Sequence, residues 1–457
     1  MSQPMENDDS VKDTSKLSKL IDDTVSIVQI QVGEHAINRE IEMKVKDVVK
    51  EVLLYTKKKD FRFKSSEIIS VGSYKEKTKI LATDEFDFLV VIDELSKPGA
   101  ISIVKDDAPP GFAYIEVNDK KLTAKWWCVD KRLRQFQYPS KFSNVPKSFS
   151  ETMLASISEI AKRQNVKLYI DNNCILRVET KEKTDRTGVT FKSVGDTFLH
   201  QASIQTPNFI LSLVVNGHPV TVDICPAIRY NNVKEVYSMR DCDYPELADR
   251  VFKKGSILFV NQYFDGFSSL KQGLFKITFT ETEVDFVHNM TKHHKNIYMF
   301  LKLLNRHFQS LLYNPFPSYV LKIACIQHSL TCESITIAVC LKHIVEILSL
   351  YTKNNFISSP FIKTYNIQKR AILEINENIL SILKDMTSDS TDITCFNRSD
   401  IDKLQSNKQL MSLYGMERQY KHRHVDPTEK CVFCKKNHLN ITPDADIHVQ
   451  LAASTFP

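Results

Sequence analysis

Two apolar runs separated by Asn216-Gly217 set the strongest local constraint on how this chain can fold. The sequence reads NFILSLVV before that pair and PVTVDICPAI after it. Asn-Gly is the preferred pair of the tight turns that join two antiparallel strands. In the second run apolar residues alternate from Val220 to Ile224, so strand geometry puts them on one face and Asp223 on the other. The segment therefore predicts a β-hairpin that carries a carboxylate opposite its core face.

Strand-like patterns dominate up to about residue 228, and helical patterns dominate from about residue 283 onward. Five more strand-like runs precede the hairpin: EIISVG, EFDFLVVID, GFAYIEV, CILRVET and GVTFKSV. The later runs, such as SYVLKIACIQHSL, have helical length and periodicity. We predict an α+β protein with a mixed β-sheet and four parts: residues 1–15 as a disordered tail, 16–235 as a sheet-containing lobe, 236–398 as an all-helical lobe, and 399–457 as a C-terminal extension.

A long N-terminal spine helix is predicted between Leu17 and about Tyr55, with Gly33 as the point where it could break. Its apolar residues recur at spacings of three and four, at Ile37, Ile41, Val45, Val48 and Val52. Such spacing forms one stripe along a helix and predicts that this stripe is buried.

Composition and the N-terminal residues narrow the class of protein. The chain has 457 residues, 42% of them hydrophobic, and a formal net charge of +6. It contains no apolar run of 18 residues, so we expect no membrane span. The N-terminus is polar and acidic, unlike a secretory signal or a transit peptide. Its ten cysteines are scattered, which favours reduced thiols and a cytoplasmic location.

Two acids two positions apart stand in an otherwise apolar run, DEFDFLVV. On a strand, Glu85 and Asp87 share one face while Phe86 and Phe88 point into the core. Together with Asp223 they would repel one another unless cations lay among them. Such acids bridge two divalent ions about 3.5–4 Å apart in enzymes of phosphoryl or nucleotidyl transfer, and Mg²⁺ or Mn²⁺ suits an all-oxygen site. For the Glu-x-Asp pair alone, solvated acids on an amphipathic strand are the commoner case.

A glycine-serine pair precedes these acids by a dozen positions. Gly72 and Ser73 follow the predicted strand EIISV and open a short helical stretch, SYKEKTK. Backbone N–H groups at the start of a helix bind phosphate, and glycine lets the backbone approach closely. The pair and the three acids together therefore favour metal-dependent catalysis on a triphosphate over isolated surface acids.

The segment VGSYKEKTKILATDEFDFLVVID resembles the signature of cyclic GMP-AMP synthase (cGAS) and the cGAS-like receptors, in the Mab-type nucleotidyltransferase family. GHPVTVDICPAI resembles the third-acid segment of that family, FKITFTETE its base-contacting strand-to-helix segment, and PSYVLKI its Ser-Tyr-x-x-Lys helix. The resemblance spans roughly residues 16–395. It implies a bilobal nucleotidyltransferase fold, with a catalytic lobe over 16–235 and a Mab-type helical lobe over 236–398.

The resemblance also implies roles for single residues. Glu85, Asp87 and Asp223 would be the catalytic acids that bind two Mg²⁺ or Mn²⁺ ions, and Asp223 would also activate the attacking ribose hydroxyl. Nucleotide contacts are implied for Gly72, Ser73, Lys276, Thr278, Glu283, Lys302, Ser318 and Tyr319. The register of Lys302 is open, and so is the choice between nucleotide contact and core packing for Tyr319.

Three departures from the family pattern, at Lys276, at Cys225 and in the zinc thumb, bear on ligand choice. The role of Lys322, which matches the pattern, is open. Lys276 stands where vertebrate cGAS has an arginine, and Cys225 where it has a threonine, which leaves the base preference open. Lys322, at the lysine of the Ser-Tyr-x-x-Lys motif, could equally be a surface charge. The cysteines of the vertebrate zinc thumb are absent, and the segment carries only His288, His293 and His294. Structural zinc favours thiolates, so we expect solvated histidines and a missing thumb, as in RNA-sensing animal cGAS-like receptors.

Basic residues gather in two segments that could bind nucleic acid. The contacts predicted here are Lys46, Lys50, Lys57, Lys58 and Lys59 on the spine helix, and Lys131, Arg132, Arg134 and Lys141 in DKRLRQFQYPSKF. Double-stranded RNA is bound mainly through its shape and its phosphates, which suits rows of Lys and Arg. Solvated helix faces are the alternative for each charge run.

The C-terminal extension contains a C-x-x-C pair. Cys431 and Cys434, with His438 and either His424 or His422, could form a Cys₂His₂ zinc knuckle. The alternative is a flexible tail that carries two reduced thiols.

With these features, the resemblance implies an innate immune, antiviral sensor. Double-stranded nucleic acid, RNA by preference and DNA as the alternative, would order the active site. Two nucleoside triphosphates (ATP, GTP or others) would then be joined into a cyclic dinucleotide, with release of pyrophosphate, for a STING-type receptor downstream. The rival predictions are a catalytically inactive Mab-type scaffold that binds nucleic acid, a DNA-activated cGAS-type enzyme, and an RNA-tailing nucleotidyltransferase.

Overall fold

The computed structural model describes most of the chain between residues 17 and 384. The described ranges are 17–26, 35–80, 85–105, 108–122, 145–166, 168–170, 176–178, 189–192, 194–205, 208–261, 274–310, 316–333, 336–367, 380 and 383–384. All of them belong to one compact unit, made of residues 1–263 and 269–395. A second unit, residues 264–268 and 396–457, lies outside the described residues, as does the predicted tail 1–15.

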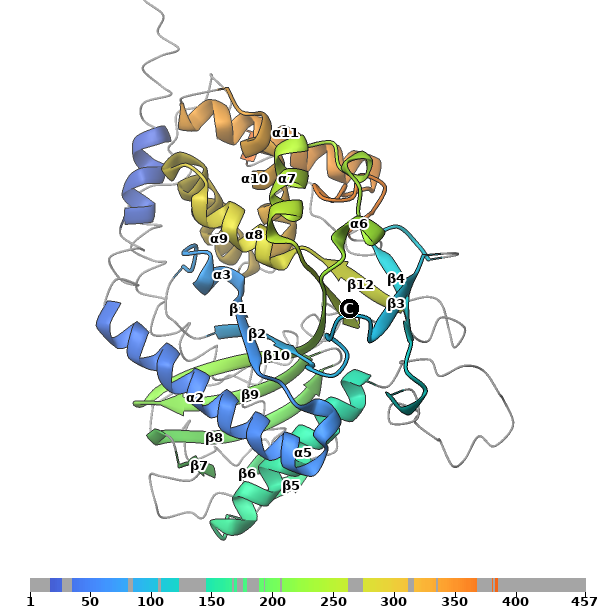
Figure 1. Cartoon of the computed structure of the whole chain (residues 1–457). Helices are drawn as coiled ribbons and strands as arrows, with labels where there is room; N and C mark the ends of the chain where they lie inside the picture. The colour runs from blue at the N-terminus through green and yellow to red at the C-terminus, as the bar shows by residue number, and fades with distance from the viewer. Residues whose placement is uncertain are drawn as a thin grey trace, which may run out of the picture. The chain divides into compact units, whose positions relative to one another are not determined.

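A large, mainly antiparallel sheet forms the centre of the described chain (Figure 1). Its strands are β1 (Glu67–Val71), β2 (Glu85–Val91), β3 (Ile101–Val104), β4 (Phe112–Val117), β5 (Leu168–Ile170), β6 (Leu176–Val178), β7 (Val189–Phe191), β8 (Val194–Gln205), β9 (Asn208–Val215), β10 (His218–Tyr230), β11 (Ile257–Asn261) and β12 (Leu274–Thr278). The main path runs β3-β4-β12-β11-β10-β9-β8-β6-β5. β2 joins it parallel to β10, and β1 pairs antiparallel with β2.

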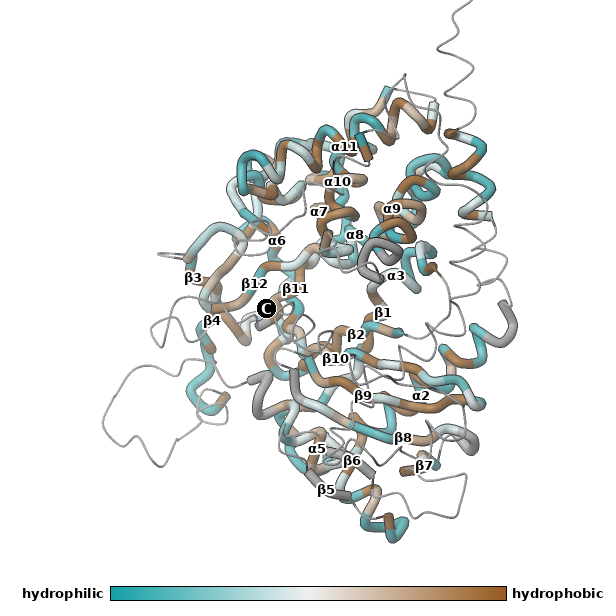
Figure 2. The backbone as a smooth tube through the Cα atoms, turned by 180° about the vertical axis from the view of Figure 1, so that it is seen from behind, coloured by the Kyte–Doolittle hydropathy of each residue, from teal (hydrophilic) through white to brown (hydrophobic). Residues whose placement is uncertain are grey.

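The hairpin predicted around Asn216-Gly217 is confirmed, because β9 and β10 pair antiparallel across it. Both turn residues have positive φ angles, 51° and 80°, as the two-residue hairpin turn requires. Val220 and Ile224 are buried, so the predicted core face of this strand is also confirmed. Figure 2 shows hydrophobic residues along β2, β9 and β10.

The predicted boundary between the two lobes does not coincide with the end of the sheet. β11 and β12 lie inside the range 236–398 that was predicted to be all-helical, yet β11 pairs with β10 and β12 pairs with β4. Their short apolar runs fill the positions between β10 and β4, where antiparallel partners satisfy their backbone groups. The named strands therefore extend to Thr278, and most of the described residues after it are helical.

Two long helices contact each other and the strands β8 and β9: α2 (His35–Lys59) and α5 (Val145–Arg163). In α2 the predicted apolar stripe is confirmed for Ile41, Val45, Val48 and Val52, which are all buried; the side chain of Ile37 is not described. Residues 17–26 are also helical, and the predicted break at Gly33 falls outside the described residues.

The short helix α3 (Gly72–Lys75) follows β1. The helices named after the β9–β10 hairpin are α6 (Val233–Val236), α7 (Pro245–Lys254), α8 (Thr280–Asn289), α9 (Lys292–Ser310), α10 (Ser318–Thr331) and α11 (Ile337–Asn354). The helices α9, α10 and α11 contact one another. Helices and a mainly antiparallel sheet together agree with the predicted α+β class. Among the described helices, none is both long and apolar enough to cross a lipid bilayer.

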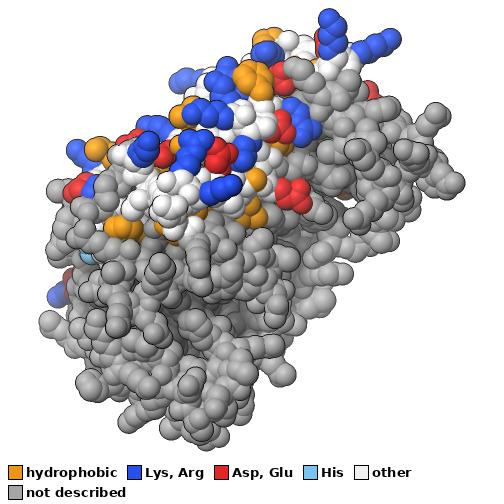
Figure 3. All heavy atoms as spheres, turned by 90° about the horizontal axis from the view of Figure 1, so that it is seen from below, with side chains coloured by type: hydrophobic (Ala, Val, Ile, Leu, Met, Phe, Trp, Pro, Cys, Tyr) orange, Lys and Arg blue, Asp and Glu red, His pale blue; other side chains and the backbone are white. Residues whose placement is uncertain are grey.

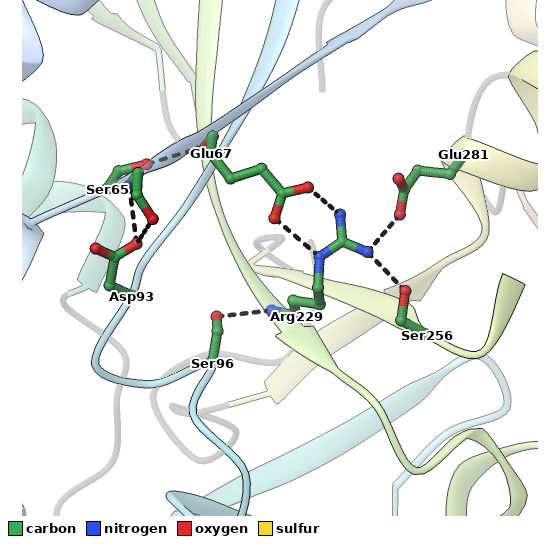
Figure 4. A network of polar contacts seen from close by, with 8 residues as sticks. Ser65, Glu67, Asp93, Ser96, Arg229, Ser256 and Glu281 are labelled. Atoms are coloured by element: carbon green, nitrogen blue, oxygen red, sulfur yellow. Dashed lines mark hydrogen bonds and ion pairs between the residues drawn. The ribbon is translucent and has the colours of Figure 1, made fainter.

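Arg229 on β10 joins the sheet to the helices (Figure 4). Its guanidinium donates to both carboxylate oxygens of Glu67 on β1, at 3.0 and 2.6 Å. It also donates to Glu281 on α8 at 2.8 Å and to the hydroxyl of Ser256 at 2.6 Å. Paired and charge-assisted hydrogen bonds of this kind are stronger than neutral ones. They hold β1, which leads directly into Gly72, in a defined position against β10.

Candidate active site

The three predicted catalytic acids lie together at one end of the β2–β10 pair. In the parallel register Asp87 stands opposite Asp223, and Glu85 stands opposite Thr221. Glu85, Asp87 and Asp223 each offer an oxygen, and these oxygens lie within 4.8 Å of one another. Glu85 is exposed, and the two aspartates are partly buried. The spatial arrangement predicted for these residues is therefore present.

The alternation predicted for β2 explains why the acids are accessible at this end. Phe86 and Phe88 are buried on the opposite face. Further along the acid-bearing face, Leu89 and Val91 pack with Cys225 in a buried apolar cluster. The strand thus carries its carboxylates at one end and buried core residues on the same face further along.

Gly72 lies directly against this acid cluster. It follows β1, whose last residue Val71 pairs with Asp87, and it begins the short helix α3. Its φ angle is +74°, and a Cβ atom placed there would lie 2.0 Å from Oδ2 of Asp87. The backbone conformation therefore favours glycine, and any larger residue would push the Asp87 carboxylate out of its position. Ser73 follows it in α3, and its carbonyl accepts a hydrogen bond from the N–H of Thr78 at 3.0 Å.

The electrostatics of the cluster show an excess of negative charge. Burial and the neighbouring carboxylates of Glu85 and Asp223 raise the pKa of Asp87 to about 7. Burial and Glu85 raise the pKa of Asp223 to about 6. Lys79 lies 3.4 Å from Glu85, and its charge offsets only part of this repulsion. Deprotonating both aspartates near neutral pH is therefore costly without a further cation.

The donor set fits a pair of hard divalent ions. All three side chains offer carboxylate oxygens, which Mg²⁺ and Mn²⁺ prefer. Two ions bridged by such acids neutralise charge on a transferring phosphoryl group. Clustered acids can also be neutralised by protons. The oxygen ligands of Glu85, Asp87 and Asp223 define which metal ions fit the site.

Lys322 was predicted as either a nucleotide-site residue or a surface charge, and the second alternative is wrong. Its amine lies 3.1 Å from Glu76 and 3.1 Å from Glu283, and its side chain is 11% exposed. Burial alone would lower the pKa of Lys322, but the two glutamates outweigh it and raise that pKa above its ordinary value. The ion pairs join α10 to α8 and to the residue that follows α3.

A small pocket lies beside this ion-pair cluster. Its walls include Lys276 and Thr278 of β12, Glu283 of α8 and Tyr319 of α10, with Tyr365 completing it. Four of the residues predicted to contact nucleotide therefore share one pocket. The hydroxyl of Tyr319 donates to Glu283 at 2.9 Å, so this tyrosine is a polar contact as well as a packed ring.

Lys276 is held between two aromatic rings of that pocket. Its amine lies 5.6 Å from the ring centre of Tyr319 and 5.8 Å from that of Tyr365, within cation–π range. Burial lowers the pKa of Lys276. Cys225, the second departure from the family pattern, is buried, and burial and Asp223 raise the pKa of its thiol to about 12. It is therefore a neutral thiol near the acids.

Four predicted nucleotide contacts lie outside this pocket: Gly72 and Ser73 at the acid cluster, and Lys302 and Ser318 on the helices α9 and α10. Lys302 on α9 donates to the carbonyl oxygen of Thr78 at 2.9 Å, which brings it to the segment that follows α3. Burial and the nearby Lys79 lower the pKa of Lys302 to about 8. Ser318 is the exposed first residue of α10 and does not line the pocket described above.

Some residues of the site gave no signal in the sequence. Glu76 is 1% exposed, although it stands in a charged stretch that reads as solvated. Tyr365 belongs to an irregular segment after α11, where no periodicity marks a pocket wall. Lys79 lies 3.4 Å from Glu85, a contact that no sequence pattern marks. The positions of Glu76 and Tyr365 depend on contacts between distant segments.

Some of the predicted nucleic-acid contacts on α2 form ion pairs with acidic side chains, and others do not do so with any described residue. Lys46 pairs with Glu42 at 2.6 Å, and Lys50 pairs with Asp47 at 2.9 Å. Lys57 and Lys58 lie near the rings of Phe61 and Tyr55, and Lys59 pairs with Glu159 at 2.8 Å. Seen from below (Figure 3), Lys and Arg side chains are interspersed with Asp and Glu on the described part of the surface. The face is therefore mixed in charge.

Several predictions concern residues for which the structure gives no placement. Lys131, Arg132, Arg134 and Lys141, and the predicted zinc ligands Cys431, Cys434, His438, His424 and His422, all lie outside the described residues. The prediction that His288, His293 and His294 are all solvated is wrong at His294. His293 is exposed and His288 is partly buried, but His294 is only 6% exposed, because α9 packs against α10 and α11.

A search against protein-family models and a search of curated proteins both find no match to the chain. The chemistry of the site therefore has to be inferred from its own side chains. Three clustered carboxylates beside a glycine turn offer oxygen ligands for divalent cations, and a small pocket lined by a lysine and two tyrosines lies on the neighbouring elements.

Proposed function

We propose that the chain is a nucleotidyltransferase of the cGAS-like receptor type, with the bilobal fold of that family, which makes a cyclic dinucleotide. The observation that carries the proposal is the parallel register of Asp87 and Asp223, with Glu85 beside them and Gly72 against Asp87. Two acids on one strand, a third on its parallel neighbour and a glycine-serine turn form the arrangement that nucleotidyl transfer from a triphosphate requires.

Each residue of the cluster has a defined task in this proposal. Glu85, Asp87 and Asp223 would hold two Mg²⁺ or Mn²⁺ ions, which when bound neutralise the charge of the triphosphate. The backbone at Gly72 and Ser73 would bind phosphate oxygens. Asp223, whose pKa is raised to about 6, would accept the proton of the attacking ribose hydroxyl. A bond forms from that oxygen to the α-phosphorus as the bond to pyrophosphate breaks, and the same exchange closes the ring.

A base would bind at the pocket between β12 and α10, which holds about 10 Å³ as it stands and would have to widen to admit it. Tyr319 and Tyr365 offer flat rings on which a base can stack, and Lys276, Thr278 and Glu283 offer donors and acceptors for its edge. Lys302 lies next to the segment after Gly72 and would approach phosphate. Because Lys276 stands between the rings, its protonation state would influence which base is accepted.

Activation would come from double-stranded nucleic acid on the surface of α2, with RNA preferred. Among the predicted contacts on that helix, Lys57 and Lys58 form no ion pair with any described residue, so we propose them as phosphate contacts. The expected receiver of the product is a STING-type receptor. In this proposal the protein works in the cytoplasm as an antiviral sensor.

The proposal is tested by product analysis with the purified full-length protein. It is incubated with labelled nucleoside triphosphates and Mg²⁺ or Mn²⁺, with double-stranded RNA, single-stranded RNA or double-stranded DNA, and products are identified by mass spectrometry. A cyclic dinucleotide made by wild type and by Asp285→Asn, but not by Asp223→Asn, is the expected result. Asp285 is a matched control because it is partly exposed on α8 and pairs with Lys254.

The other outcomes separate the rival functions. Extension of an RNA 3′ end without a cyclic product would identify a tailing enzyme. A cyclic product only with DNA would identify a DNA-activated enzyme. Nucleic-acid binding without any product, under every ligand and metal, would favour the catalytically inactive scaffold.

A further inference from the structure

Four potential metal ligands meet between α9, α10 and α11, on elements different from those that carry the catalytic acids. His294 comes from the first turn of α9, His328 from the last turn of α10, Cys332 follows α10 directly, and Cys340 lies in the first turn of α11. One ligand atom of each residue lies within 4.8 Å of the ligand atoms of the other three. His294, His328 and Cys340 are buried, and Cys332 is partly buried.

The spacing of the two thiols suits a shared metal ion better than a disulfide. The sulfur atoms of Cys332 and Cys340 are 3.5 Å apart, whereas a disulfide bond is about 2.05 Å long. Two thiolates bound to one zinc ion at about 2.3 Å in tetrahedral geometry stand roughly 3.8 Å apart. The observed separation therefore needs only a small adjustment to accept the ion.

The two imidazoles each present a buried nitrogen toward no described partner. Nε2 of His294 and Nε2 of His328 are both inaccessible to solvent and have no hydrogen-bond partner in the described part of the chain. Buried polar atoms are normally satisfied, and leaving them unpaired is costly. The two rings are neighbours, with centres 5.2 Å apart. Two such nitrogens beside two thiols are the usual ligands of structural zinc.

Thr291 orients one of these rings. Its hydroxyl oxygen lies 3.0 Å from Nδ1 of His294. When Nδ1–H donates to this oxygen, Nε2 carries the lone pair and can bind a metal. Zinc-binding histidines almost always use their other nitrogen in this way, which fixes the ring and its tautomer.

We propose that His294, His328, Cys332 and Cys340 bind one structural Zn²⁺ ion. Two nitrogen and two sulfur ligands in tetrahedral arrangement favour zinc among the biological divalent ions. Four protein ligands close its coordination sphere, so the ion would have a structural role. It would link the start of α9, the end of α10 and the start of α11. The proposal concerns neither the predicted C-terminal knuckle nor the proposed catalytic activity.

The metal content of the purified full-length protein tests the proposal. Zinc per chain is measured by elemental mass spectrometry for wild type, for Cys332→Ser with Cys340→Ser, and for Cys431→Ser with Cys434→Ser. The proposal predicts that the first double variant loses one zinc equivalent, and that the second retains this equivalent whether or not the knuckle also binds zinc. Equal zinc content in wild type and in the first variant would overturn it, as would wild type without zinc.

A second measurement covers the case in which the first double variant does not fold. The Cys431→Ser, Cys434→Ser protein is reconstituted with Co²⁺, and its absorption spectrum is recorded. Thiolate-to-cobalt charge-transfer bands with the visible bands of tetrahedral cobalt are expected, because two thiolates remain at the proposed site. Their absence would overturn the proposal, as would a Cys332–Cys340 disulfide found by peptide mapping without reduction.

Two single variants then test the choice of histidine ligands. In the same background, His328→Ala should lose the cobalt spectrum or change it strongly. His343→Ala should keep it, because His343 is exposed and lies outside the four-residue set, although its ring centre is 5.6 Å from that of His328. The opposite pattern would contradict the proposed ligand set.

Discussion

Replacing Gly72 by alanine should remove metal binding at the acid cluster while leaving the fold in place. The new Cβ atom would lie 2.0 Å from Oδ2 of Asp87, whereas ordinary contact begins at 3.4 Å. The carboxylate must therefore retreat by about 1.4 Å, which changes its position relative to Glu85 and Asp223. A misplacement of about 1 Å in a catalytic group can cost roughly 100-fold in rate, so we expect at least a hundredfold loss of nucleotidyl transfer.

Gly99→Ala is the matched control for this change. Gly99 has a φ angle of +73°, close to the +74° of Gly72, but a Cβ atom there would meet nothing within 4 Å. Both variants therefore have the same backbone strain, about 1–2 kcal/mol for an L-residue in the left-handed region. The difference between them isolates the contact with Asp87.

Two measurements separate the strain from the effect on the site. Urea unfolding should show similar losses of stability for the two variants. Titration with Mn²⁺, monitored by calorimetry, should show wild-type affinity for Gly99→Ala and a strongly weakened affinity for Gly72→Ala. If Gly72→Ala binds Mn²⁺ and transfers nucleotides as well as the control, the close contact between Gly72 and Asp87 does not matter for the site.

Three further predictions concern charge. Burial and neighbouring carboxylates raise the pKa of Asp87 to about 7, so the folded state binds this proton more tightly than the unfolded state. Without divalent ions, the free energy of unfolding should therefore fall as pH rises from about 4 to 7. Asp87→Asn should flatten this loss in thermal unfolding; an unchanged slope would contradict the assignment. Lys322→Met should lower the free energy of unfolding by about 3–5 kcal/mol, because it leaves two carboxylates buried without their cation. Lys50→Ala should lower it by at most about 1 kcal/mol, because that ion pair is exposed. Equal losses for the two variants in urea unfolding would refute this difference. Lys57→Ala with Lys58→Ala should weaken double-stranded RNA binding and reduce its salt slope by about one for each lysine contact, and an unchanged slope would exclude that surface.

Local sequence patterns were sufficient to predict the hairpin and the strand face on which Glu85 and Asp87 lie. The Asn216-Gly217 turn fixes which residues of β10 face the core, and alternation in β2 does the same for Glu85 and Asp87. These features depend on neighbouring residues only. The direct register between Asp87 and Asp223 is different, because β2 and β10 are far apart in sequence and pair parallel. No local pattern specifies that pairing; the sequence analysis predicted that the three acids meet, but not the parallel register that brings them together.

The errors concern residues whose environment is set by distant segments. Lys322 looks like a surface charge in sequence, but Glu76 and Glu283 arrive from other elements and make it a buried ion pair. His294 looks solvated within a polar run, but the packing of α9 against α10 and α11 buries it. The predicted run GVTFKSV covers β7 and only the first residue of β8, Val194, because polar residues such as His200 and Gln201 interrupt the apolar alternation of β8. Its pairing with β9 supplies the stabilisation that its sequence does not reveal.

The central claim is that Glu85, Asp87 and Asp223 hold a pair of divalent ions that act on a triphosphate. The most direct test is anomalous X-ray scattering from crystals of the protein grown with Mn²⁺ and a non-hydrolysable nucleoside triphosphate. We predict two manganese peaks about 3.5–4 Å apart among the three carboxylates, with the triphosphate extending toward Gly72. Manganese bound only elsewhere, or a triphosphate bound away from these acids, would contradict the claim.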